Sequence, residues 1–386
     1  MIPVRLNNSV RVENHDSRSY ALIDPDIGET ELRYVLDAVG SGWVSSRGPY
    51  VREFENRFAA YCDARYGVSA SNGTAALHLA LASLRVGPGD EVIVPALTFI
   101  ATAAAVAYTG ATPVFAESDP NTWCIDPNSV RRLITPHTRA VIPVHLYGHP
   151  ADMNPILATA EEYQLAVIED AAEAHGSTYY GRRVGGIGRM AIFSFYGNKT
   201  ITAGEGGMLV TNDAALAARA RLLSNHAMDP EKRYWHEEIG YNYRMSNVQA
   251  ALALAQFERI EPLIERKREI FRWYKEFLSE IEGLELNPEM PWAGNSYWLT
   301  CVVLPRRVCR DAVMAKLEMS AIEVRPFFHP IHRLPAFRGN ARKAESLNVA
   351  EDLACRGISL PSGARLNKDD VRHISAVLLE AIRDSV

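Results

Sequence analysis

Three segments of the chain carry residues that could do chemistry together. The first is Asn72-Gly73-Thr74, which precedes an apolar segment with helical spacing. Gly73 allows a ligand to approach the backbone closely, and Thr74 offers a hydroxyl beside the free N–H groups of a helix start. This arrangement suits a phosphate dianion. The alternative is an N-cap followed by an ordinary amphipathic helix.

The second segment is the acidic pair Glu169-Asp170, which ends an apolar run that begins at Leu165. We expect Asp170 at the rim of a sheet, where a buried carboxylate requires a cationic partner. A protonated pyridine nitrogen is such a partner. The alternative is an aspartate that caps the following helix.

The third segment contains Lys199, between the apolar run 193–195 and the glycine-rich turn 200–207. In a low-dielectric site the pKa of a lysine amine falls, which favours the neutral nucleophile that forms Schiff bases. A lysine without such neighbours is more often a solvated surface charge. Together the three segments match the phosphate, pyridine nitrogen and aldehyde of pyridoxal phosphate (PLP). The sequence therefore predicts a PLP enzyme with Lys199 and Asp170 as catalytic residues.

The elements that must position these residues alternate between short apolar strands and helical segments from about residue 66 to 213. Near-continuous apolar strands separated by helices predict an α/β fold, with a largely parallel sheet covered on both faces. Ligands of such sheets gather at the carboxyl ends of the strands. All three segments lie at such ends or at the helix starts beside them.

The length of 386 residues is too great for one ordinary core. A long helical segment is expected at about 246–282, followed by strands at 297–304 and 322–328 and helices at 310–319, 345–356 and 368–382. We predict a large PLP-binding domain over residues 1–255 and a small C-terminal domain over 256–386.

The composition excludes several other classes of protein. The net charge is −5 and the basic residues are scattered, so we expect no nucleic-acid partner and no membrane partner. Five cysteines without a Cys-x-x-Cys pair and a polar N-terminus predict a cytoplasmic protein. His145 and His149 are four residues apart in a strand-to-loop segment, where this spacing does not bring them together, and we predict no metal.

Several long motifs in one order give the chain a family resemblance. They are 72–78 (NGTAALH), 95–102 (PALTFIAT), 143–148 (PVHLYG), the Asp170 and Lys199 segments, and 240–246 (GYNYRMS). The chain resembles the sugar aminotransferases of the DegT/DnrJ/EryC1/StrS family, of the fold-type I PLP class, from residue 42 to the last helix. The resemblance implies a large domain with a mostly parallel seven-stranded sheet and a smaller C-terminal α+β domain.

The resemblance also implies roles for individual residues. Lys199 looks like the lysine that holds PLP as a Schiff base and moves the proton, and Asp170 looks like the partner of the pyridine nitrogen. The other implied cofactor contacts are Gly73, Thr74 and Ser194 at the phosphate, Phe99 on the ring, and Asn242 from a neighbouring subunit. A homodimer with shared active sites follows. Related sugar dehydratases carry His at the position of Lys199, which argues against that activity.

Glu173 departs from the family pattern, because many members have Gln here, near the phenolic oxygen of the cofactor. A carboxylate would repel a phenolate unless it is protonated or turned away. This feature, with residues 228–235 and 325–332, resembles GDP-perosamine synthases, which implies GDP-4-keto-6-deoxy-D-mannose as amino acceptor and L-glutamate as donor. The alternatives are another dTDP- or UDP-linked 3- or 4-keto sugar, or a regulatory protein of the same fold without turnover.

Four further residues are candidates for substrate binding: His329, Arg325, Tyr297 and Trp298. The aromatic faces suit a base or sugar, and packing in the core or at a subunit interface is the alternative. Arg325 suits a phosphate or the glutamate carboxylate, with a salt bridge as the alternative. Tyr234 and Trp235 fall under the same two interpretations, and His145 is a further candidate for a place beneath the cofactor.

Overall fold

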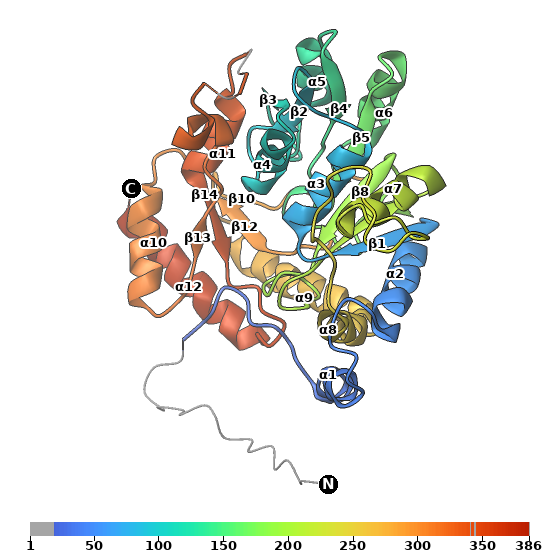
Figure 1. Ribbon diagram of the computed structural model, residues 1–386. Helices are drawn as coiled ribbons and strands as arrows, with labels where there is room; N and C mark the ends of the chain where they lie inside the picture. The colour runs from blue at the N-terminus through green and yellow to red at the C-terminus, as the bar shows by residue number, and fades with distance from the viewer. Residues whose placement is uncertain (1–18, 340, 343–344, 386) are drawn as a thin grey trace.

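The computed structural model describes residues 19–339, 341–342 and 345–385, and its centre is a seven-stranded sheet (Figure 1). The strand order is β1-β9-β8-β5-β4-β2-β3. Strand β9 runs antiparallel to both neighbours, and the other pairings are parallel. The strands are β1 (Tyr66–Ala70), β2 (Glu91–Pro95), β3 (Thr112–Ala116), β4 (Thr138–Val141), β5 (Ala166–Asp170), β8 (Met190–Ser194) and β9 (Gly207–Thr211). The predicted α/β class with a mostly parallel sheet is confirmed.

Both faces of this sheet are covered, as its apolar strands require. Successive residues of a strand point to opposite faces. In β8, Met190 and Ile192 belong to one buried cluster, and Ala191 and Phe193 belong to a second. The helices of this part are α1 (Glu29–Gly40), α2 (Pro49–Tyr61), α3 (Gly73–Ser83), α4 (Ala101–Tyr108), α5 (Pro127–Leu133), α6 (Met153–Glu162) and α7 (Ala214–Ser224).

The C-terminal part has its own four-stranded antiparallel sheet, in the order β10-β12-β14-β13, and a separate buried cluster. Its strands and helices are β10 (Glu285–Leu286), β12 (Thr300–Val303), β13 (Arg325–Pro326), β14 (Gly357–Leu360), α10 (Arg310–Met319), α11 (Asn348–Arg356) and α12 (Lys368–Asp384). Helices α10 and α12 pack together beside this sheet in Figure 1. The smaller α+β part is thus confirmed, while the division at residue 255 stays a prediction.

Short elements complete the chain. A three-stranded sheet joins the two parts through β11 (Ala293–Gly294), β6 (Thr178–Tyr179) and β7 (Arg182–Arg183). Single turns of 3-10 helix are η1 (Leu146–Gly148), η2 (Ile331–Arg333) and η3 (Pro335–Phe337). Over the described residues, we find no helix with the length and apolar character needed to cross a membrane.

The long helix expected at about 246–282 is wrong as a single element. The structure has two helices, α8 (Asn247–Phe257) and α9 (Ile260–Leu278). The chain leaves helical geometry at Arg259, with φ −110° and ψ 14°. Pro262 explains the break, because it has no N–H to donate to the Glu258 carbonyl and its ring would clash with that group. A proline is tolerated in the first turn of a helix, which is where α9 places it.

Lys267 of α9 is a buried cation without a carboxylate contact among the described hydrogen bonds and ion pairs. Lys267 is only 4% exposed, and its Nζ donates a 2.6 Å hydrogen bond to the Ser362 carbonyl. Burial lowers the pKa of Lys267 from 10.5 to about 7. The native protein therefore binds this proton less tightly than the unfolded chain does. The buried charge therefore lowers the free energy of unfolding by its full amount below pH 7, and this penalty decreases as the pH rises from 7 toward 10.5.

We predict that Lys267→Met stabilises the protein at pH 6 by about 2 kcal/mol, the charge penalty less the lost hydrogen bond. At pH 10 less than about 1 kcal/mol of the penalty is left and the lost hydrogen bond offsets it, so the same substitution should change the stability by less than about 1 kcal/mol. Urea unfolding at several pH values measures both effects. Lys275→Met is the control, because Lys275 lies exposed on the same helix. A difference between parent and Lys267→Met that is independent of pH would contradict the prediction.

Candidate active site

A cavity of about 740 Å³ lies at the carboxyl ends of β5 and β8 and at the start of α3. This is a volume typical of small-molecule sites. Residues from all three predicted segments line it, together with residues of the C-terminal part. The parallel sheet thus brings together groups that are 126 residues apart in the chain, from Gly73 to Lys199.

One end of the cavity is built by the first turn of α3. The Asn72 side chain caps this helix by accepting a 2.8 Å hydrogen bond from the Ala75 N–H. A Cβ atom on Gly73 would lie 2.8 Å from the Cβ of Ser194, so a glycine is needed for the helix start to meet the end of β8. Thr74 and Ser194 both line the cavity. Their hydroxyls and the N-terminal N–H groups form a site suited to a phosphate.

Asp170, the last residue of β5, supplies a buried carboxylate that is 5% exposed. Its oxygens accept hydrogen bonds of 2.8 Å from the Thr102 hydroxyl and 3.2 Å from the Ala172 N–H. Burial raises the pKa of Asp170, although the two hydrogen bonds and the charge of Lys199 oppose the rise. A carboxylate so placed is stabilised by a cation inside the cavity.

Glu169 points to the opposite side of β5, as strand alternation requires. It is fully buried and accepts hydrogen bonds from the backbone N–H groups of Gly185, Ile187 and Gly188. The other contact of its carboxylate is His145 Nε2 at 3.0 Å, and His145 Nδ1 accepts from the Ala151 N–H at 3.0 Å. Because Nδ1 is an acceptor, the ring proton of neutral His145 lies on Nε2. Both ring nitrogens of His145 are thus engaged, and the ring is not part of the cavity lining.

The amine of Lys199 lies between an acid and an aromatic ring. Nζ is 3.7 Å from Glu173 Oε1 and 3.7 Å from the centroid of the Trp298 ring. Burial lowers the pKa of Lys199, while the charges of Glu173 and Asp170 oppose the fall. A buried amine with a lowered pKa is a neutral nucleophile over a wider pH range than an exposed lysine.

Glu173 is 4% exposed, and its Oε2 accepts a 2.9 Å hydrogen bond from the Tyr147 N–H. Burial raises the pKa of Glu173, although the charge of Lys199 and the Tyr147 hydrogen bond lower it in part. The carboxylate is the form that pairs with the Lys199 amine, and the raised pKa makes the protonated form more accessible than in an exposed glutamate. The protonated form avoids the repulsion expected between a carboxylate and a phenolate at this position.

The structure separates the other predicted site residues into two groups. Phe99, Trp298 and Arg325 line the cavity, and Phe99 keeps 54% of its surface exposed, so one ring face is open to a ligand. Tyr297 does not line it: this side chain is 4% exposed and stacks on Phe271 with ring centroids 3.8 Å apart.

Three more predicted residues or pairs also lie outside the cavity lining of their own chain. His329 and Asn242 are exposed. Tyr234 and Trp235 are exposed too, at 74% and 47%, with the cationic groups of Arg233 and Lys232 over their respective rings.

Sequence reasoning missed several residues of the cavity. Thr102 donates to Asp170, and Tyr147 fixes Glu173, although both lie in motifs that the family resemblance singled out. The remaining lining residues without a predicted role include Tyr108, Tyr196, Glu205 and Tyr243. Only Thr102 gave a usable signal, since a hydroxyl in an otherwise apolar helical segment requires a hydrogen-bond partner.

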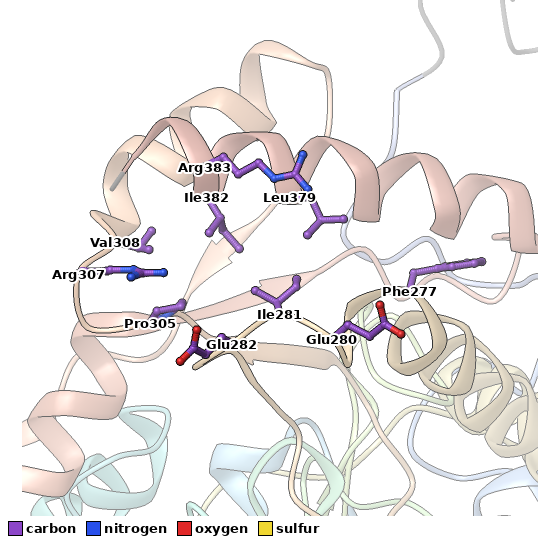
Figure 2. A pocket seen from close by; sticks show the side chains of 10 residues that line it. All are labelled: Phe277, Glu280, Ile281, Glu282, Pro305, Arg307, Val308, Leu379, Ile382 and Arg383. Carbon is purple, nitrogen blue, oxygen red and sulfur yellow. The ribbon is translucent and has the colours of Figure 1, made fainter.

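A second, smaller cavity of about 370 Å³ lies in the C-terminal part, near the ends of α9 and α12. Figure 2 shows Ile281, Leu379 and Ile382 around it, with two glutamates and two arginines at its edges. Its ten lining residues include no lysine, histidine, cysteine, serine or threonine. The larger cavity is therefore the candidate active site.

Comparison with known proteins assigns this site to a class. The model of the DegT/DnrJ/EryC1/StrS aminotransferase family matches residues 25–379, and the chain belongs to this family. A GDP-perosamine synthase of Caulobacter vibrioides is 44% identical over 357 residues, 92% of this chain and 96% of that protein. The crystal structure of DesV of S. venezuelae superposes with a TM-score of 0.87 at 38% identity, covering 95% and 99% of the two chains.

A Streptococcus pneumoniae protein solved in its PLP form superposes with a TM-score of 0.91 at 26% identity, covering 96% of this chain and 100% of that one. The chain is a PLP-dependent aminotransferase. The cavity fits this cofactor on its own evidence, because a phosphate-binding helix start, a buried carboxylate and a buried amine face one space. These groups match the three chemical handles of PLP.

We predict that Glu173→Gln lowers the pKa of Lys199 further, because it removes an anion that raises this pKa. The rate at which cofactor-free protein forms its covalent adduct with PLP should then rise to its plateau at a lower pH. A shift of one pH unit gives about a tenfold faster reaction below the midpoint. Stopped-flow absorbance across a pH series measures it.

Glu205→Gln is the matched control for this experiment, since Glu205 lines the same cavity but is not among the groups that shift the pKa of Lys199. Its pH midpoint should equal that of the parent. A midpoint in Glu173→Gln that stays in place or moves upward would contradict the assigned interaction between Glu173 and Lys199.

Proposed function

We propose that this aminotransferase moves the amino group of L-glutamate to a nucleotide-linked keto sugar, GDP-4-keto-6-deoxy-D-mannose, to give GDP-perosamine. The observation that carries the proposal is the near-complete match to a GDP-perosamine synthase, 44% identical over 92% of this chain. Glu173 supports the same assignment, because it departs from the Gln of many family members in the manner of those enzymes. The volume of about 740 Å³ has room for the cofactor and a sugar together.

The residues of the cavity divide the chemistry among them. Bound PLP supplies an electron sink for the carbanion formed beside the amino group. Asp170 holds the proton on the ring nitrogen that this sink requires. Lys199 is the covalent anchor, and its neutral amine removes a proton from the donor carbon and returns one to the acceptor carbon. Gly73, Thr74 and Ser194 hold the phosphate and so fix the position of the reacting carbon.

The rim of the cavity suits the remaining parts of the substrates. Phe99 offers an open aromatic face to the cofactor ring, and its ring centroid lies 5.7 Å from that of Phe328. Arg325 lies exposed at the cavity, with Glu323 3.1 Å from its guanidinium. A guanidinium that keeps most of its donors free matches a diphosphate or the carboxylate of glutamate. His329, exposed in the same segment, is kept as a candidate for the far end of the nucleotide sugar.

We also propose that the protein is a homodimer in which Asn242 reaches the cofactor phosphate of the neighbouring subunit. Asn242 is exposed and outside the cavity of its own chain. Helix α1 shows an apolar face to solvent, at Leu32, Leu36 and Val39, and Trp43 follows it with 55% of its surface exposed. Apolar residues spaced in this way on an exposed helix are typical of a subunit interface.

We predict that GDP-4-keto-6-deoxymannose, offered with glutamate beside dTDP- and UDP-linked keto sugars, shows a kcat/KM at least about 100-fold above the others. Mass spectrometry identifies the amino sugar, and Lys199→Ala, which lacks the anchoring amine, is the inactive control. Exclusive turnover of a dTDP- or UDP-linked sugar would contradict the sugar assignment and leave the class intact. No turnover of any sugar, with PLP bound to Lys199, would favour a regulatory protein.

The shared site predicts that two inactive variants complement each other. Lys199→Ala and Asn242→Ala should each lose most activity alone, and subunit exchange between them should restore about a quarter of the parent activity. Half of randomly mixed dimers are hybrids, and each hybrid has one intact site of two. If Asn242 served its own chain, the mixture would stay as inactive as its parts. Mixing Lys199→Ala with Asp170→Asn is the control without rescue, because both residues belong to one cavity.

A further inference from the structure

Trp298 makes two contacts with the segment that carries the catalytic lysine. It lies just before β12 in the C-terminal part and is 4% exposed. Its indole Nε1–H donates a 2.7 Å hydrogen bond to the carbonyl of Asn198, the residue before Lys199. The second contact is the ring itself, with Lys199 Nζ 3.7 Å from its centroid. One side chain from the C-terminal part therefore holds both the backbone and the amine of this segment.

The Trp298 ring belongs to a group of nearly parallel aromatic rings. Tyr147 stacks against it with an interplanar angle of 17° and ring centroids 6.4 Å apart. Tyr147 also stacks on Phe328, at 10° and 5.7 Å. Since Tyr147 is 2% exposed, this group has little freedom to rotate.

These contacts close into a cycle around the amine. The Tyr147 N–H donates to Glu173 Oε2, and the other oxygen of Glu173 faces Lys199 Nζ at 3.7 Å. The amine in turn faces the Trp298 ring, which stacks on Tyr147. A lysine side chain has up to about 2 kcal/mol of rotamer entropy to lose on being fixed. Glu173 and the Trp298 ring are two partners whose contacts with the amine offset this cost.

We propose that Trp298 is a positioning residue for Lys199: the indole N–H holds the lysine loop, and the ring face, together with Glu173, receives the amine whenever it is not bonded to the cofactor. This inference rests on the proposed aminotransferase chemistry, in which the amine alternates between a bonded and a free state. The contacts with Glu173 and the Trp298 ring then keep the free amine in one orientation within the cavity.

The protonation of Lys199 depends on every charged group that faces it. Glu173 and Asp170 raise the pKa of the lysine, and burial lowers it. His175 is also close, and burial lowers the pKa of His175 to about 3, so its ring is neutral. The aromatic face of Trp298 favours the ammonium form, because the π-system of an indole attracts a cation. Loss of this face should therefore lower the pKa of Lys199.

The test measures how fast full-length cofactor-free protein forms its Lys199 adduct with PLP, as a function of pH. Trp298→Leu removes the ring and the N–H. We expect its pH midpoint to fall by about one unit and its plateau rate to fall several-fold. Trp298→Phe keeps a ring but loses the hydrogen bond to Asn198. Its midpoint should stay within about half a unit of the parent, while its plateau rate falls as in the leucine variant.

Trp273→Leu is the matched control, since Trp273 is a partly buried tryptophan of α9 with Arg266 over its ring, and it has no contact with Lys199 among those described. Its midpoint and plateau should equal those of the parent. A midpoint in Trp298→Leu that is unchanged or raised would overturn the role of the ring, since a rise indicates that the ring only excludes water. A parent-like plateau in Trp298→Phe would overturn the role of the N–H, and this variant decides the matter if the leucine variant does not fold.

The same measurement keeps this inference distinct from the proposed function. If the parent protein forms no PLP adduct that Lys199→Ala abolishes, the proposed function itself fails. If the parent reacts and both Trp298 variants follow the parent curve, the aminotransferase assignment stands and the positioning role of Trp298 is rejected.

Discussion

The burial of one amine is the constraint on which the rest of the site depends. In the proposed function Lys199 acts as a neutral amine, and burial lowers its pKa because removal from water disfavours the charged form. Complete isolation would leave a polar group without partners, at a cost of a few kcal/mol. Glu173 and the Trp298 ring resolve this conflict, because each contacts the amine at 3.7 Å without forming a short, strong ion pair.

The sheet places the buried amine in one cavity with two other polar groups, the Asp170 carboxylate and the phosphate site at the start of α3. Because successive strand residues point to opposite faces, Glu169 accepts hydrogen bonds from three backbone N–H groups, whereas Asp170 faces the cavity and accepts one from Thr102. The next strand in the sheet, β8, ends at Ser194, against the helix start at Gly73. Asp170 and Ser194 thus reach the cavity because each is the last residue of its strand.

Much of this could be predicted from the sequence, for identifiable reasons. Apolar strands alternating with helices determined the fold class, and the order of helix start, strand-end acid and loop lysine determined the cofactor chemistry. Predictions failed where a local pattern was overridden by geometry. Pro262 breaks the expected long helix, and the expected strand at 322–328 is reduced to β13 at Arg325–Pro326 and an isolated bridge between Ile322 and Tyr20. Tyr297 and Trp298 are adjacent in sequence, yet one stacks on Phe271 and the other reaches Lys199.

The partners of Thr102, Tyr147 and Trp298 could not be identified from the sequence, because each of these residues contacts a group far away in the chain. A hydrogen bond from Thr102 to Asp170 spans 68 residues, and that from Trp298 to Asn198 spans 100. No periodicity or local motif encodes a contact of that kind, since it exists only after the sheet has formed and the C-terminal part has packed onto it.

The packing of the C-terminal part has a consequence for the electrostatics of the cavity. Three carboxyl groups, Asp170, Glu173 and Glu205, line the cavity together with the Lys199 amine and Arg325. A phosphate dianion bound at the helix start would add negative charge, which a protonated acid would offset. Burial raises the pKa of both acids, but Asp170 accepts a hydroxyl donor as well as a backbone donor, whereas Glu173 accepts one backbone donor and faces Lys199. In the proposed function a protonated ring nitrogen would pair with Asp170 and the lysine amine would be bonded to the cofactor, which would leave Glu173 without a cation beside it. Burial, which raises the pKa of Glu173, would then favour its protonated form.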